Sequence, residues 1–169
     1  MRIWRNGKVN PPTWEERFWA KVDKSGECWE WTGYKNAQGY GRYAAYWPEG
    51  KQNTMAHRFA YEQEHGLRLD PKLEIDHMCF NKSCVNPAHL RLATSKQNKE
   101  NHSGPQSNST SGVRGVYRNK EGTKWQAVVT HHKKVYYLGV FDTIPEAEAV
   151  VVAKRLELFT YNLLDRRAA

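Results

Sequence analysis

The stretch DHMCFNKSCVNPAHL, residues 76–90, decides the fold, because it combines soft metal ligands with a hard one, the Asp76 carboxylate. Cys79, Cys84 and His89 follow one another at intervals of five residues. Two thiolates and an imidazole in one short loop can close around a tetrahedral Zn²⁺, which takes four protein ligands in structural sites. Cys28 is the only other cysteine, so we expect it to be the fourth ligand. The alternative is three buried free thiols without a metal.

A second set of ligands belongs to a different chemistry. Asp76 and Asn98 offer carboxylate and amide oxygens, which suit Mg²⁺ or Mn²⁺. His77 lies between the two sets, and a neutral imidazole beside a metal-bound phosphate can deprotonate water. The metal then stabilises the charge that develops on the phosphate and the leaving oxygen. The alternative is that Asp76 and His77 are a satisfied polar pair at the edge of a core.

Composition narrows the class of protein. The chain has 169 residues, with 26 Lys and Arg against 18 Asp and Glu, a net charge of +8 and a pI of about 9.4. No apolar run approaches the roughly 18 residues of a membrane span. The basic N-terminus lacks an apolar stretch, so we expect no signal peptide. The odd number of cysteines argues against a disulfide framework, and the basic balance favours nucleic acid as partner.

The organisation follows from composition and periodicity. The polar segment HSGPQSNSTS, residues 102–111, is typical of a linker and separates residues 1–101 from residues 112–169. Thr13 with Glu16 three residues later predicts a helix start, and Gly66 predicts a helix end. We expect strands at 28–31, 40–46 and 73–77, and helices at 55–64 and, capped by Ser95, at 95–101. In the second part we expect strands at 115–118, 125–131 and 135–141, then a helix from Pro145 to about residue 161. The fold class is α+β.

Basic and aromatic residues alternate along the strands of the second part. Cations can neutralise phosphates while aromatic and polar side chains reach sugars and bases, and a small sheet can enter the major groove. The alternative is a solvated sheet face. The residues that could share one face are Arg114, Tyr117, Arg118, Lys124, Trp125, Gln126, Thr130 and Tyr137.

Over about residues 13–101, the pattern of Asp76-His77, Asn86, His89 and Asn98 resembles the HNH endonucleases, whose active site is a ββα-metal (His-Me) finger. CWEWTG at 28–33, GYGRY at 39–43 and HRFAYE at 57–62 also resemble phage-type HNH proteins. The cysteine spacing resembles zinc-bearing homing endonucleases of the His-Cys box group.

That resemblance implies a role for each matching residue. His77 would be the general base, and Asp76 with Asn98 would hold a single catalytic Mg²⁺ or Mn²⁺. Asn86 would brace the loop and orient His77. Either Arg42 or Arg58 would support the scissile phosphate. The implied structural zinc ligands are Cys28, Cys79, Cys84 and His89.

SGVRGVYR at 111–118, KWQA at 124–127 and YYLGVFDTIPEAEAVVVAK at 136–154 resemble the AP-two / ethylene-response-factor DNA-binding domain. That domain is a small three-stranded antiparallel sheet packed on one helix. Tyr117, Thr130 and Val135 stand where plant members often carry arginine, so no target sequence is carried over. The resemblance implies DNA contacts by Arg114, Tyr117, Arg118, Lys124, Gln126, Thr130 and Tyr137.

Together these features predict a site-specific DNA endonuclease of the phage homing type, which hydrolyses phosphodiester bonds with one divalent metal ion and a histidine base. It would act on double-stranded DNA, without a membrane partner, in the cytoplasm of the phage's host. The alternative is a non-enzymatic, zinc-containing DNA-binding regulator. An RNA-binding module is disfavoured because the central strands lack paired stacking aromatics. The target sequence, nicking versus double-strand cutting, and monomer versus homodimer stay open.

Overall fold

The computed structural model of the chain describes residues 11–47, 50–102, 104–105 and 108–168. The chain divides into two compact units, Met1–Leu92 and Ala93–Ala169. This division lies upstream of the boundary at residue 101 that the sequence predicts.

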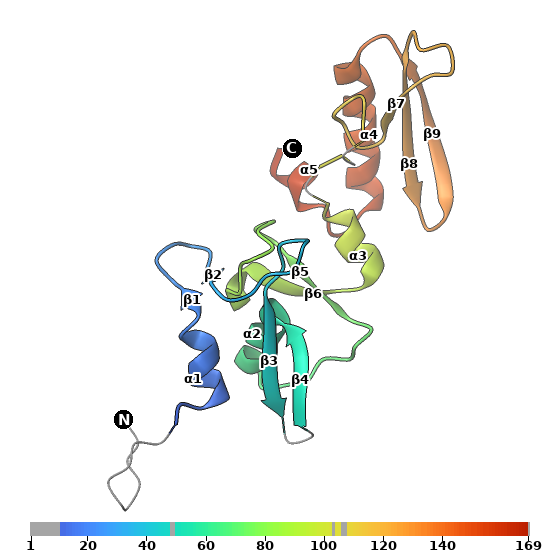
Figure 1. The fold of residues 1–169 in the computed structure, drawn as a ribbon. Helices are drawn as coiled ribbons and strands as arrows, with labels where there is room; N and C mark the ends of the chain where they lie inside the picture. Colours follow the sequence, from blue (N-terminus) through green and yellow to red (C-terminus); the bar gives the residue numbers. More distant parts are fainter. Residues whose placement is uncertain (1–10, 48–49, 103, 106–107, 169) are drawn as a thin grey trace, which may run out of the picture. The chain divides into compact units, whose positions relative to one another are not determined.

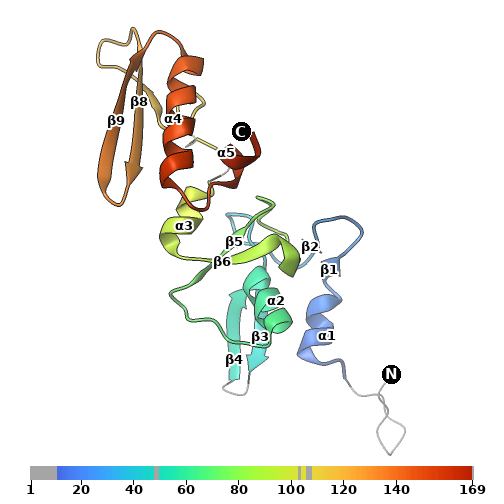
Figure 2. The ribbon, with the colours of Figure 1, turned by 180° about the vertical axis from the view of Figure 1, so that it is seen from behind.

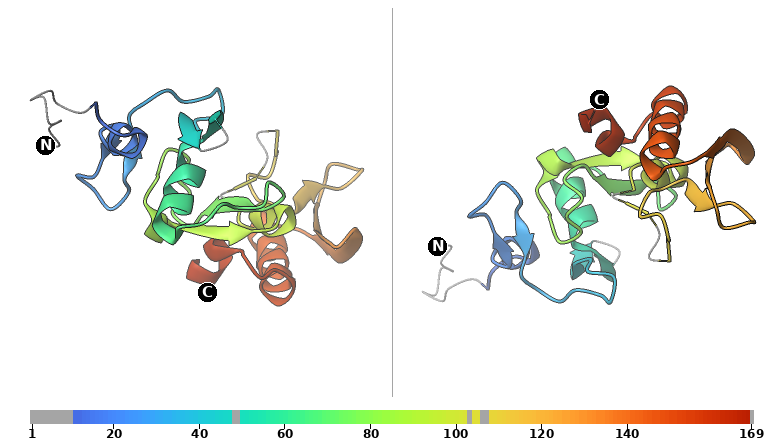
Figure 3. Two further views of the ribbon diagram at one scale, coloured as in Figure 1. Left: turned by 90° about the horizontal axis from the view of Figure 1, so that it is seen from below. Right: turned by 90° about the horizontal axis from the view of Figure 1, so that it is seen from above.

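The first unit is built from short elements. Three two-stranded sheets pair β1 with β2, β3 with β4, and β5 with β6. Helix α2 lies across the β3–β4 hairpin (Figure 2) and between α1 and the β5–β6 pair (Figure 3). In chain order the elements are α1 (Trp14–Trp19), β1 (Val22–Asp23), β2 (Glu30–Trp31), β3 (Arg42–Trp47), β4 (Gly50–Met55), α2 (Ala56–His65), β5 (Glu74–His77), the 3₁₀ turn η1 (Pro87–His89) and β6 (Leu90–Ala93).

Local signals place both helices of the first unit. Thr13 caps α1 and forms a capping box with Glu16, as the sequence predicts. Gly66 ends α2 in the left-handed conformation, at φ 60°. Helix α1 ends at Trp19, and Val22 beyond it pairs with Trp31 in the β1–β2 sheet.

Aromatic rings fill the core of the first unit. Phe18 stacks on Trp31 at 4.9 Å and packs on Phe59 at 4.5 Å between ring centroids. Gly33 and Gly41 lie against the Trp31 indole, where an added Cβ would come within 2.6 and 2.5 Å of ring atoms. Both glycines are therefore needed for this packing. The buried hydrophobic residues of the core are Phe18, Trp31, Tyr43, Ala45, Ala56, Phe59, Ala60 and Val85.

The second unit is a three-stranded antiparallel sheet in the order β7-β8-β9, with α4 along one face (Figure 1). Alternate residues of β8 point toward α4, so Trp125, Ala127 and Val129 are buried. They pack with Val116, Ala147, Val151 and Phe159. The elements are α3 (Ser95–Glu100), β7 (Val116–Arg118), β8 (Trp125–His131), β9 (Lys134–Phe141), α4 (Ile144–Leu158) and α5 (Leu163–Ala168).

A two-residue turn joins β8 to β9. His131 pairs with Lys134, and the residues between them, His132 and Lys133, have φ values of 48° and 64°. Two positive φ values define a type I′ turn, for which Asn-Gly is the favoured pair. A bulky residue in this conformation costs on the order of 1 kcal/mol. The turn is therefore built from residues that local conformational energy alone would not select.

Helix α3 is bonded into the second unit. The Glu100 carboxylate accepts hydrogen bonds from the backbone N–H groups of Thr160 (2.9 Å) and Tyr161 (3.2 Å). The Arg114 guanidinium donates to the carbonyl oxygens of Glu100 (2.9 Å) and Lys99 (3.0 Å), which satisfies the end of the helix. Thr94, not Ser95, is the N-cap.

Among the described residues, no helix is long and apolar enough to cross a membrane.

We predict that the buried ion pair between α4 and α5 stabilises the second unit. Arg155 and Asp165 are 7% and 9% exposed, and the guanidinium donates twice to the carboxylate, at 2.7 and 2.8 Å. Asp165→Asn leaves a buried arginine uncompensated, so the free energy of unfolding should fall by roughly 3 kcal/mol. Urea unfolding followed by circular dichroism measures this loss.

Asp142→Asn is the matched control, because Asp142 pairs with Lys124 on the surface. Its unfolding midpoint should stay at the wild-type value. Equal effects of the two substitutions would contradict the role assigned to the buried pair.

Candidate metal centre and active site

The structure brings four soft ligands of the first unit together. The ligand atoms of Cys28, Cys79, Cys84 and His89 all lie within 4.8 Å of one another. His89 Nδ1 is 3.6 Å from Cys28 Sγ and 3.6 Å from Cys84 Sγ. Tetrahedral zinc with Zn–S of about 2.3 Å and Zn–N of about 2.0 Å separates sulfur from nitrogen by about 3.5 Å, close to these distances. The cluster therefore has the donor set and the dimensions of a Cys₃His metal site.

Backbone pairing brings Cys28 to the loop that carries the other ligands. Glu30 and Cys84 form an isolated antiparallel bridge. On either side of it, the Trp31 N–H donates to the Ser83 carbonyl at 3.0 Å and the Val85 N–H donates to the Trp29 carbonyl at 2.8 Å. The sequence separation between Cys28 and Cys84 is thus closed by a short ladder of backbone hydrogen bonds.

Side chains brace the same loop. The Glu30 carboxylate accepts from the Asn81 amide and from the Ser83 hydroxyl. Asn86 donates to the Glu27 carbonyl at 2.9 Å and caps η1 by accepting from the Ala88 N–H at 3.1 Å. Asn86 thereby braces the loop; its predicted effect on His77 stays a prediction.

Proton sharing within the cluster favours a thiolate. A hydrogen bond from the Cys84 thiol lowers the pKa of Cys79 to about 5, and the same bond raises the pKa of Cys84. Burial raises the pKa of Cys28. Metals bind the thiolate form of cysteine, so the lowered pKa of Cys79 favours metal binding.

Asp76 and His77 end strand β5, and both side chains are buried. The Asp76 carboxylate pairs with Arg91 Nε at 2.8 Å. His77 Nε2 lies 3.1 Å from the Cys84 carbonyl oxygen. A carbonyl only accepts, so Nε2 carries the proton and Nδ1 is the basic nitrogen of the neutral ring. Burial lowers the pKa of His77, which favours that neutral form.

A second buried histidine, to which the sequence analysis assigns no role, packs on His77. The rings of His57 and His77 are 4.6 Å apart, and Tyr40 lies 5.7 and 5.9 Å from them. Burial, His77 and Arg58 together lower the pKa of His57 to about 3. In the described part of the chain, its buried Nδ1 has no hydrogen-bond partner. The sequence signal that could have identified His57 is its place at the start of HRFAYE, in the first turn of α2.

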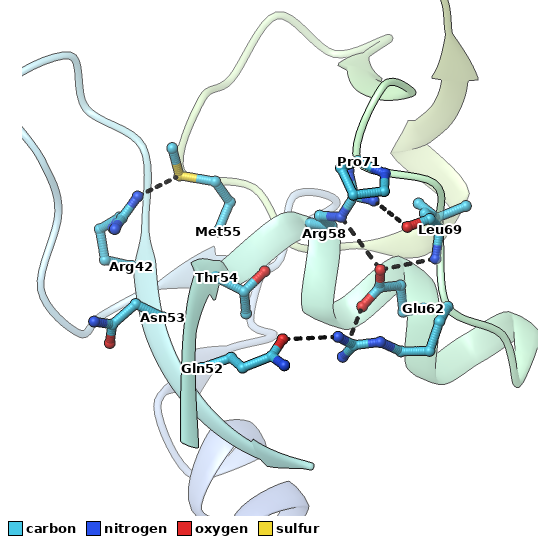
Figure 4. A pocket seen from close by; sticks show the side chains of 10 residues that line it. Arg42, Gln52, Asn53, Thr54, Met55, Arg58, Glu62, Leu69 and Pro71 are labelled. Carbon is cyan, nitrogen blue, oxygen red and sulfur yellow. Dashed lines mark hydrogen bonds and ion pairs between the residues drawn. The ribbon is translucent and has the colours of Figure 1, made fainter. Parts of the chain in front are cut away.

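The two candidate arginines line one polar pocket of about 330 Å³ beside β3, β4 and α2 (Figure 4). Arg58 donates to the carbonyl oxygens of Leu69 (2.7 Å) and Leu73 (2.9 Å), and thereby fixes the loop after α2. The Arg42 guanidinium lies 3.7 Å from the Met55 sulfur, a weak acceptor. Of the two, Arg42 keeps more hydrogen-bonding capacity for a phosphate, and both assignments stay predictions.

Asn98 lies on α3 of the second unit, whereas Asp76 and His77 lie on β5 of the first. The shared cation site of Asp76 and Asn98 therefore stays a prediction from the sequence.

The predicted DNA contacts of the second unit fall into two groups, one on the exposed face of the sheet and one with side chains that already have partners. Pairing along the sheet aligns Tyr117 with Gln126 and Val128 with Tyr137, on the face opposite α4. Thr130 follows on the same face of β8. The other predicted contacts have partners within the unit: Arg114 holds the end of α3, Arg118 stacks at 3.9 Å over the Trp125 ring, and Lys124 pairs with Asp142 at 2.8 Å.

Comparison with known proteins supports a nuclease. Residues 54–100, which include Asp76, His77 and Asn98, match the family described as HNH endonuclease. Over this segment the chain is similar to the HNH endonucleases, which points to a nuclease. No solved structure gives a significant match.

The relatives are phage proteins. The chain is 42% identical over 74 residues to Protein 7.7 of Escherichia phage T7, which covers 44% of this chain and 53% of that protein. It is 35% identical over 79 residues to Protein 2.8 of the same phage, and this match covers 46% of this chain and 50% of that protein. It is 39% identical over 59 residues to the uncharacterized gene 5.3 protein of Enterobacteria phage T3, and this match covers 34% of this chain and 57% of that protein. The chain thus spans about half the length of the curated relatives that it matches.

We predict that the purified chain carries one tightly bound zinc ion, because the four ligands fit a tetrahedral site. Plasma mass spectrometry should find about one zinc per chain. His89→Ala should lose most of this metal and destabilise the first unit, since metal affinity contributes to folding. His102→Ala, at an exposed position, should retain it. A fully folded wild-type chain without zinc would refute the site.

We also predict that His57 makes the first unit acid-sensitive. Its pKa is lowered from 6.5 to about 3 in the folded chain, so the unfolded chain binds the proton more tightly. Its contribution is complete above pH 6.5 and is lost progressively as the pH falls toward 3. Between pH 7 and 5 the wild type should lose roughly 2 kcal/mol relative to His57→Phe.

Urea unfolding of both proteins at several pH values measures this difference. His65→Phe replaces an exposed histidine of the same helix and should follow the wild type. Parallel pH profiles of the wild type and His57→Phe would contradict the prediction.

Proposed function

We propose that this chain is a site-specific endonuclease of the phage homing type that hydrolyses phosphodiester bonds of double-stranded DNA. The observation that carries the proposal is the hydrogen bond between His77 Nε2 and the Cys84 carbonyl, 3.1 Å long, inside the segment that matches the HNH endonucleases. That bond leaves Nδ1 as the basic nitrogen, and a fixed imidazole is the group that a general base requires.

In the proposed reaction, His77 Nδ1 accepts a proton from a water molecule whose oxygen attacks the phosphorus. The bond from phosphorus to the leaving sugar oxygen then breaks. Asp76 and Asn98 would hold one Mg²⁺ or Mn²⁺, which stabilises charge on the phosphate and the leaving oxygen. Arg91 Nε donates to Asp76 Oδ2 and helps to fix the position of this carboxylate. Arg42, with its weak sulfur partner, would contact the scissile phosphate.

The second unit would supply much of the DNA affinity. Its sheet face carries Tyr117 and Tyr137 at 57% and 59% exposure, an unusual degree for rings of this size. Gln126 and Thr130 lie between and beside them. Exposed rings together with polar side chains on a sheet suit the edges of bases and the sugars of a major groove. This face supports the proposed resemblance to the AP-two / ethylene-response-factor domain.

We predict that His77→Ala lowers cleavage at least 100-fold, the lower end of the range for a general base. The purified full chain would be incubated with Mg²⁺ and a pool of random-sequence duplexes, and the ends on both strands would be mapped by sequencing. His65→Ala is the matched control and should cut at the wild-type rate. Equal zinc content of the variants shows that the fold is kept.

Cleavage by His77→Ala at the wild-type rate would contradict the base assignment. If the wild type binds duplexes but leaves them intact with Mg²⁺ or Mn²⁺, the chain is a DNA-binding regulator instead.

A further inference from the structure

A cleft of about 500 Å³ lies within the second unit, between α3 and the turn that joins β8 to β9. Its lining carries four cationic side chains, Lys96, Lys99, Arg114 and Lys133, and one carboxylate, that of Glu100. We call it the α3 cleft. None of the residues that the sequence analysis assigns to DNA belongs to it except Arg114 and Thr130.

The cations of the α3 cleft divide into two groups. Lys96 pairs with the buried Glu100 at 2.5 Å, and Arg114 donates to backbone carbonyls, so their charges have partners within the unit. Lys99 and Lys133 are exposed. Among the ion pairs of the described residues, neither of these two ammonium groups takes part. The cleft therefore presents two unneutralised cations on a framework that is already bonded together.

The hairpin turn between β8 and β9 lines one side of this cleft. His132 and Lys133 both have positive φ, where Asn-Gly would fit with less strain. The His131 and His132 rings are in edge contact at 4.3 Å, and both residues line the cleft. A strained conformation at two residues with cationic or titratable side chains points to a role for these side chains.

The α3 cleft is continuous with the exposed sheet face. Thr130 lines the cleft and also lies on the face of β8 that is opposite α4. Lys133 follows it three residues later, past the end of the strand. A duplex that contacts the sheet at Thr130 would therefore bring its sugar-phosphate backbone to the cleft.

We propose that the α3 cleft binds backbone phosphates of duplex DNA through Lys99 and Lys133. The inference rests on the proposed function of the second unit and adds to it a contact that fixes position without reading bases. Phosphates match the two unneutralised ammonium groups, and the size of the cleft suits a backbone segment better than a single ion. The double-helical backbone is the occupant because the cleft adjoins the face proposed to enter the groove.

The test compares three variants of the full, zinc-loaded chain by fluorescence anisotropy with random-sequence duplexes, without added Mg²⁺, over a series of salt concentrations. Lys99→Gln with Lys133→Gln should weaken binding roughly 10-fold and reduce the log–log salt slope by about 2. The loss should be equal for unrelated duplex sequences, because phosphates carry no sequence information.

Two further variants separate the possible outcomes. Lys154→Gln with Arg167→Gln removes the same charge from α4 and α5 and should leave the slope at the wild-type value. Tyr137→Ala on the sheet face should weaken binding without changing the slope. If the Lys99/Lys133 variant has the wild-type salt slope while Tyr137→Ala binds DNA more weakly, the α3 cleft does not bind phosphates. DNA binding by the second unit would then still stand. A wild-type chain that binds no duplex would overturn both.

Discussion

The first unit depends on the placement of one residue, Cys84. Its sulfur belongs to the Cys₃His cluster, its carbonyl oxygen accepts from His77 Nε2 at 3.1 Å, and its backbone pairs with Glu30. The ligand loop, the strand that carries Cys28 and the proposed catalytic imidazole are therefore tied to the same backbone segment. A metal bound to the cluster would hold this segment and would thereby fix the direction of the His77 ring, because the Cys84 carbonyl sets the ring orientation.

This dependence follows from the small size of the first unit's core. The aromatic cluster around Phe18 and Trp31 packs α1, β3 and α2 together. The loop between β5 and β6 contributes one buried apolar side chain, Val85, to that cluster. Small domains that lack apolar contacts in a loop commonly use a metal to order it. With a metal bound, the Cys₃His cluster would replace hydrophobic packing in the part of the chain where the chemistry is proposed to occur.

The sequence predicted best what depends on local chemistry. The Thr13–Glu16 capping box, the left-handed Gly66, the three strands of the second unit and the four soft ligands all follow from spacing and residue type. Strand β4 was missed because its residues are polar and mostly exposed, so no alternation marks it. The roles of Arg114 and Arg58 could not be predicted, because a guanidinium bonds to whichever carbonyl oxygens the tertiary fold brings to it, and spacing does not encode those.

Helix α3 contributes a residue to each of two proposed sites. It carries Asn98, inside the segment that matches the HNH endonucleases, and Lys99, in the proposed phosphate cleft. Arg114 and the Glu100 carboxylate hold this six-residue helix to the second unit. A helix so short has little stability of its own, so its conformation is maintained by these tertiary bonds. The helical conformation around Asn98, the proposed cation ligand, therefore depends on hydrogen bonds within the unit that is proposed to bind DNA.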